Sequence, residues 1–106
     1  MKTAIDLIAQ ERERQLNVEG WTLEHDQEHE NDELSWAAVC YATPQGRRSP
    51  ATRFVNMYDE EELPYPEDWP WEPESWKPTP DDRIRELVKA GALIVAEIER
   101  LQNLDK

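Results

Sequence analysis

Three stretches of the chain place apolar residues at helical spacing. In the first, Thr3 and Asp6 have the spacing of a capping box. Gly20 follows as a residue suited to the left-handed end of a helix. We therefore predict a helix over residues 3–19. Its apolar face carries Ile5, Ile8, Ala9 and Leu16, with Arg12 as a cation inside it.

A second helix is predicted over residues 32–42. Either Asn31 or Asp32 can cap its first turn. Its inner face is rich in small side chains, which would let another helix approach closely. This face carries Leu34, Ala37, Ala38 and Tyr41.

A third and longer helix is predicted over residues 80–104. Thr79 is suited to its N-cap and Pro80 to its first position, and two aspartates follow where the helix dipole favours them. Gly91 costs about 1 kcal/mol relative to alanine inside a helix. A close crossing against the two alanines of the second helix would explain it. The residues expected to be buried are Ile84, Leu87, Val88, Gly91, Ile94, Val95, Ile98 and Leu101.

Residues 43–79, which join the second helix to the third, have a different character. Within residues 59–80 lie six of the eight prolines and three of the five tryptophans. Prolines at this density oppose both helices and strand ladders, whereas indole rings favour burial. We expect an ordered loop wrapped over the helices with its tryptophans as anchors, and a short strand over residues 53–58.

These elements predict a mainly α fold in one domain over residues 1–106, with two shorter helices, a long C-terminal helix and an ordered Trp/Pro-rich loop. With 38 % apolar residues the core must be small, which favours a homo-oligomer. A net charge of −12 opposes direct binding to nucleic acid, because such binding needs Lys and Arg. No apolar run is long enough for a membrane span, and Cys40 has no partner for a disulfide. We therefore expect a cytoplasmic protein.

The segment EGWTLEHDQEH, residues 19–29, is a first candidate for chemistry. On a helix, His25, His29 and Glu33 would share one face and suit a zinc-like ion, but the segment lacks a helical pattern. Glu30 and Glu33 have the E-x-x-E spacing with which small helical nucleotide pyrophosphohydrolases hold Mg²⁺. The matching E-x-x-D spacing occurs nowhere. We expect no catalytic residue, no metal and no cofactor.

A set of cations and aromatic rings is more unusual in so acidic a chain. Cations beside stacking rings are what an anionic molecule with a base requires. Arg12, Arg85 and Lys89 would neutralise phosphate. Trp21 and Trp76 would stack on the base. The alternative is that the cations pair with acids and the tryptophans belong to the core. The candidate ligand-binding residues are Arg12, Arg14, Gln15, Trp21, His25, Asp26, Trp76, Lys77, Arg85 and Lys89.

Four segments resemble a family of small phage and prophage proteins: ERERQLNVEGWTLEHDQEH, ELSWAAVCYAT, WPWEPESWKP and RELVKAGALIVAEIERL. The resemblance covers nearly the whole chain outside residues 45–66. It implies a phage-encoded protein in the cytoplasm of the bacterial host. The chain departs from the family pattern at Ser75, where a further tryptophan is expected. It departs again at Asp32, where a glycine is expected and the aspartate indicates an unstrained turn.

A shorter part of the chain is similar to ryanodine-receptor-type repeat domains, whose bacterial relatives are thought to sense nucleotide-derived ligands. This similarity is an analogy of fold, and it agrees with the set of cations and rings. We expect a non-catalytic binder of a nucleotide-derived anionic small molecule, which in a phage would sequester a host immune signal. One alternative is an acidic protein–protein inhibitor or DNA mimic acting on a host nuclease or defence complex. Another is a MazG-like, Mg²⁺-dependent nucleotide pyrophosphohydrolase.

Overall fold

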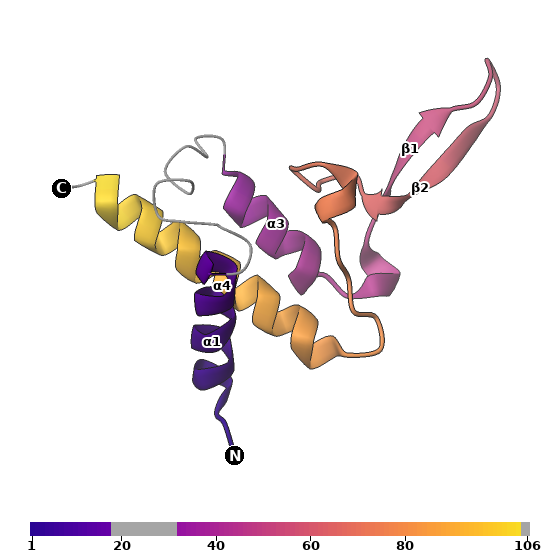
Figure 1. The fold of residues 1–106 in the computed structure, drawn as a ribbon. Helices are drawn as coiled ribbons and strands as arrows, with labels where there is room; N and C mark the ends of the chain where they lie inside the picture. Colours follow the sequence, from indigo (N-terminus) through magenta and orange to yellow (C-terminus); the bar gives the residue numbers. More distant parts are fainter. Residues whose placement is uncertain (18–31, 105–106) are drawn as a thin grey trace.

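The computed structural model describes residues 1–17 and 32–104, which form three α-helices and one two-stranded antiparallel sheet (Figure 1). The long helix α4 contacts both α1 and α3, while the hairpin of β1 and β2 points away from the helices. The fold is therefore mainly helical, with a β-hairpin added. The elements are α1 (Ala4–Asn17), α3 (Glu33–Ala42), β1 (Pro50–Phe54), β2 (Glu60–Pro66) and α4 (Arg83–Leu104), with 3₁₀ turns at Gln45–Arg47 and Pro73–Ser75.

The helix starts follow the local signals in one case and depart from them in another. At α1, Thr3 N donates to Asp6 Oδ2 at 3.0 Å and Asp6 N donates to Thr3 Oγ1 at 3.1 Å, which confirms the capping box. The helix α4 begins three residues later than predicted, because Asp82 and not Thr79 caps it. Asp82 Oδ1 accepts a hydrogen bond from the amide three residues on, at 3.0 Å. Thr79 instead closes a turn in front of the helix, its carbonyl accepting from Asp82 N at 2.8 Å.

The inner face of α3 is buried as predicted, and Tyr41 on this face is the centre of an aromatic cluster. Trp76 stacks on Tyr41 with ring centroids 4.7 Å apart, and Trp69 meets Tyr41 edge-on at 5.5 Å. Trp69 Nε1 donates to Glu72 O at 3.1 Å, so the buried ring keeps a polar partner. The proline-rich segment is therefore held to α3 by its indole rings.

The prediction that residues 59–80 contain no strand is wrong, since residues 60–66 form β2. Phe54 pairs with Glu60 near the tip of the hairpin, and Pro50 pairs with Pro66 at its base. In a two-stranded sheet each strand has one free edge. Prolines are tolerated where the missing N–H would point to that edge or where the register is irregular, as it is next to Pro50.

The prediction of a buried aliphatic stripe on α4 is also wrong for most of its members. Of that stripe Val88 is buried, and Gly91 and Val95 are partly buried. The side of α4 that packs on the other helices carries small residues, because α1 and α3 both approach it closely. The buried residues there include Ala90, Ala92, Leu93 and Ala96. The exposed members of the stripe are Ile84, Leu87, Ile94, Ile98 and Leu101.

Gly91 does mark a close helix crossing, but against α1 and not against the alanines of α3. A Cβ atom at Gly91 would lie 2.7 Å from Ile8 Cδ1.

Asp32, just before α3, has φ 63°, in the left-handed region that favours glycine. The expectation of an unstrained turn at Asp32 is therefore wrong.

No described helix is both long and apolar enough to cross a membrane.

Candidate functional site

A cavity of about 180 Å³ lies between α1, α4 and the segment that leads into Lys77. Four cationic residues and one acidic residue line it, in a chain whose net charge is −12. The cavity is lined by Glu11, Arg14, Gln15, Tyr41, Ser75, Lys77, Arg85, Lys89 and Leu93. Five of the candidate residues named from the sequence meet here, namely Arg14, Gln15, Lys77, Arg85 and Lys89.

Glu11 holds two of these cations in place. Arg14 Nε and Nη2 each donate to Glu11 at 2.8 Å, and Arg85 Nη2 lies 2.6 Å from Glu11 Oε1. Burial raises the pKa of Glu11, but the hydrogen bond from Arg14 and the charge of Arg85 outweigh it. The pKa of Glu11 therefore lies below its ordinary value of 4.5. An ionised carboxylate at neutral pH thus orients two guanidinium groups at the cavity wall.

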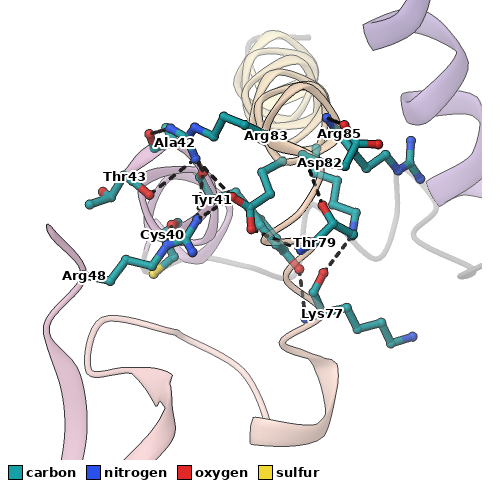
Figure 2. A network of polar contacts seen from close by, with 12 residues as sticks. Cys40, Tyr41, Ala42, Thr43, Arg48, Lys77, Thr79, Asp82, Arg83 and Arg85 are labelled. Carbon is teal, nitrogen blue, oxygen red and sulfur yellow. Dashed lines mark hydrogen bonds and ion pairs between the residues drawn. The ribbon is translucent and has the colours of Figure 1, made fainter. Parts of the chain in front are cut away.

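Lys89 and Tyr41 form another part of the cavity wall. Lys89 Nζ donates to Lys77 O at 2.7 Å and lies 5.4 Å from the centroid of the Tyr41 ring. Lys77 N in turn donates to Tyr41 Oη at 3.2 Å (Figure 2). The aromatic core therefore fixes the backbone that closes the cavity.

Gln15 adds a neutral polar group to the charged wall. Its side chain is buried, and its Nε2 donates to Glu11 Oε2 at 3.3 Å. Among the described residues its Oε1 has no hydrogen-bond partner. A buried acceptor without a partner is costly, so a ligand N–H or O–H at this position would be stabilised.

The other candidate residues lie elsewhere. Arg12 is buried, with its Nε 3.5 Å from Glu99 Oε1, and is not part of the cavity wall. Trp76 packs between Tyr41 and Arg48, whose guanidinium lies 5.2 Å from the centroid of the indole ring. It lines a different, open cavity of about 470 Å³ at the base of the hairpin. Neither Arg12 nor Trp76 therefore lines this cavity, although both were predicted to bind the ligand. Trp21, His25 and Asp26 lie outside the described residues.

A second cationic cluster has a structural task. Arg48 and Arg83 point at the last carbonyl groups of α3, with Arg48 Nε donating to Cys40 O at 2.8 Å and Arg83 Nη1 donating to Tyr41 O at 2.8 Å (Figure 2). Both also bind Glu86 Oε1, at 3.1 and 3.2 Å. Cations at the C-terminal end of a helix offset its dipole and satisfy its free carbonyl groups. These arginines therefore join the end of α3 to the start of α4.

The metal-dependent alternatives rest in part on His25, His29 and Glu30, which lie outside the described residues. Among the described residues no group of three or more His, Cys, Asp or Glu side chains is placed to hold a metal ion. The carboxylate of Glu86 is bound by two arginines, and Asp82 caps α4. Burial raises the pKa of the Cys40 thiol to about 11, so it is not a ready nucleophile.

Comparisons with known proteins give no assignment. No family model matches the chain, and neither a curated protein nor a solved structure is similar enough to count as a match.

Proposed function

We propose that this protein binds a small, multiply charged anion without converting it, and that the anion is derived from a nucleotide. The observation that carries the proposal is that four cationic residues line one cavity of about 180 Å³ in a chain of net charge −12. The volume is below the roughly 300 Å³ at which pockets for whole drug-sized ligands begin. The cavity would therefore take a phosphate group, while the rest of the molecule would lie at its mouth.

The excess of cationic over acidic residues in the cavity lining favours anions with more than one charge. An incoming phosphate must share Arg14 and Arg85 with the carboxylate of Glu11 and must also accept its repulsion. Attraction to the four cationic residues and repulsion by Glu11 both grow with the charge of the anion, and the cations outnumber Glu11, so the net attraction is weakest for a singly charged anion. A phosphate with two charges, or two phosphates in series, gains more from each guanidinium. In a phage-infected cell, such a binder would sequester a nucleotide signal of the host.

We expect inorganic phosphate, pyrophosphate, and linear and cyclic nucleotides to differ in how far they raise the melting temperature, with at least one multiply charged nucleotide raising it clearly. Arg85→Gln and Lys89→Gln should each weaken the binding of that nucleotide about 10- to 100-fold, because each removes a charged hydrogen bond. Isothermal titration calorimetry measures the effect.

The matched control is Arg53→Gln, which removes an equally charged but exposed residue of the hairpin. It should leave the affinity unchanged. The proposal fails if no anion in the set raises the melting temperature, or if Arg53→Gln weakens binding as much as Arg85→Gln does.

The hairpin favours one second candidate function, that of an acidic inhibitor of a host protein. Its tip places four large apolar side chains in solvent. The turn that carries them is preorganised, since Asn56 Oδ1 accepts hydrogen bonds from Tyr58 N at 2.8 Å and Asp59 N at 2.9 Å. Acidic residues of β2 flank the tip, which suits an apolar cleft with a basic rim. The exposed apolar residues are Phe54, Val55, Met57 and Tyr58.

If the hairpin acts in this way, an excess of the protein should slow DNA cleavage by at least one purified host nuclease. The double variant Met57→Glu/Tyr58→Glu should abolish that inhibition, because it places charge on the apolar tip. Ile5→Glu, which charges an exposed position on α1, should not. Uninhibited cleavage with every nuclease tested would remove this candidate.

A further inference from the structure

Four of the exposed aliphatic side chains of α4 lie along one side of the helix. Leu87, Ile94 and Leu101 follow one another at seven-residue intervals, and Ile98 lies between the last two. Each of them is between 47 % and 50 % exposed. Contact between aliphatic side chains and water is unfavourable. Seven-residue spacing of apolar side chains is the pattern that packs against another helix. We define these four residues as the α4 seam.

The α4 seam continues into a groove between α4 and α3. The groove has a volume of about 290 Å³ and is mostly apolar. On the α3 side its wall consists of small residues and the exposed Val39, so a further helix can approach closely. The groove is lined by Ser35, Ala38, Val39, Ala42, Ile94, Glu97 and Ile98.

The lack of free charge on this face favours contact between two copies here. Two chains of net charge −12 repel each other, so they associate most easily through a surface without free charge. The α4 seam contains no ionisable residue. Glu97, the acid in the groove wall, is buried and paired with Arg100. A second copy therefore meets little repulsion here.

The area is also sufficient for a pair of copies. A helix of 22 residues is about 33 Å long and about 10 Å wide, and α3 extends the face on one side. Together they offer roughly 500 Å² on each copy, hence roughly 1,000 Å² in a symmetric pair, which is where specific interfaces begin. We infer that the protein forms a two-fold symmetric dimer in which the α4 seam of each copy packs into the α3–α4 groove of the other.

This inference is independent of the proposed function. Arg85, Lys89 and Leu93 line the anion cavity on one side of α4. At 100° per residue, Lys89 and Ile98 lie on opposite sides of the helix. The oligomeric state and the anion affinity can therefore be tested one without the other.

The test is sedimentation velocity of the full chain over a range of concentrations and salt. The wild-type protein should be a dimer, and added NaCl should tighten it by screening the repulsion between copies. Ile94→Asp/Ile98→Asp should weaken the dimer by at least about 100-fold, because it places four carboxylates in the interface. Met57→Asp/Tyr58→Asp adds the same charge at the hairpin tip and should leave the dimer intact.

Circular dichroism shows whether the seam variant still folds. Both substituted positions are about half exposed in a single copy, so its helix content should be unchanged. The inference is overturned if the wild-type chain is monomeric at every concentration. It is equally overturned if the folded seam variant remains as dimeric as the hairpin variant.

Discussion

Replacing Glu86 with alanine is expected to lower the free energy of unfolding by about 3–5 kcal/mol, because it removes the buried carboxylate shared by the largely buried Arg48 and the partly exposed Arg83. Glu86 is 2 % exposed and accepts hydrogen bonds from Arg48, Arg83 and Thr79 N at 3.1, 3.2 and 3.1 Å. The substitution therefore releases the end of α3 and the turn before α4 together. Urea unfolding at neutral pH measures the loss. The control is Glu61→Ala, which removes an exposed partner of Arg53 and should cost less than about 1 kcal/mol.

The same carboxylate gives the stability a pH dependence. Burial raises the pKa of Glu86, but the hydrogen bonds and charges of Arg48 and Arg83 outweigh it, so its pKa lies below 4.5. The unfolded chain therefore binds this proton at higher pH than the folded chain does. The contribution of Glu86 is fully present above pH 4.5 and is lost as the pH falls through the depressed value. In Glu86→Gln, the free energy of unfolding should fall less steeply than in the wild type as the pH is lowered below 4.5. The same dependence on pH in both proteins would contradict this prediction.

Replacing Trp69 with alanine is expected to cost about 3–5 kcal/mol, the usual range for a large ring removed from a core. Trp69 is 7 % exposed and meets three other rings, with centroids 5.5 Å from Tyr41, 5.4 Å from Trp71 and 5.0 Å from Trp76. Its loss leaves a cavity where the proline-rich segment meets α3. Near-ultraviolet circular dichroism should report the lost ring packing along with the lower melting temperature.

Trp36 provides the matched control for this prediction. It lies on the outer side of α3 and is 47 % exposed. Trp36→Ala should therefore change the melting temperature far less than Trp69→Ala. Equal effects of the two substitutions would mean that the aromatic cluster does not hold the proline-rich segment to the helices.

Signals that act within a few residues predicted part of the local structure of the described residues. The capping box of Thr3 and Asp6 and the inner face of α3 follow from side chains that contact their own helix or its neighbour. The start of α4 was misplaced because Thr79 and Asp82 both suit an N-cap. Thr79 Oγ1 donates to Asp82 O, and Asp82 Oδ1 accepts the hydrogen bond from Arg85 N that caps the helix.

The aliphatic stripe of α4 shows a different limit of sequence analysis. Periodicity identifies an apolar face, but it does not say which partner covers that face. Within one copy α1 and α3 pack on the side of α4 that carries alanines and Leu93, and Leu87 and Ile94 remain exposed. In the proposed dimer these two residues would be covered by the second copy.

The candidate site could be predicted in part. Cations such as Arg85 and Lys89 are conspicuous in an acidic chain, and they were found for that reason. Glu11 was missed because it is one of 24 acidic residues, and its position three residues before Arg14 is common in helices. Tyr41 was assigned to the core, which is correct. Its hydroxyl contact with Lys77 depends on how the chain returns after the hairpin.

The attachment of the hairpin has a consequence for how this protein can diversify. Arg48, just before β1, is bound to the end of α3 and to Glu86, so the base of the hairpin is anchored to the helices. Beyond this anchor the residues from Thr52 to Glu60 are all exposed. New sequences, or even added residues, between those two positions need not disturb the packing of the helices. The tip can therefore change in sequence while the scaffold that presents it stays the same.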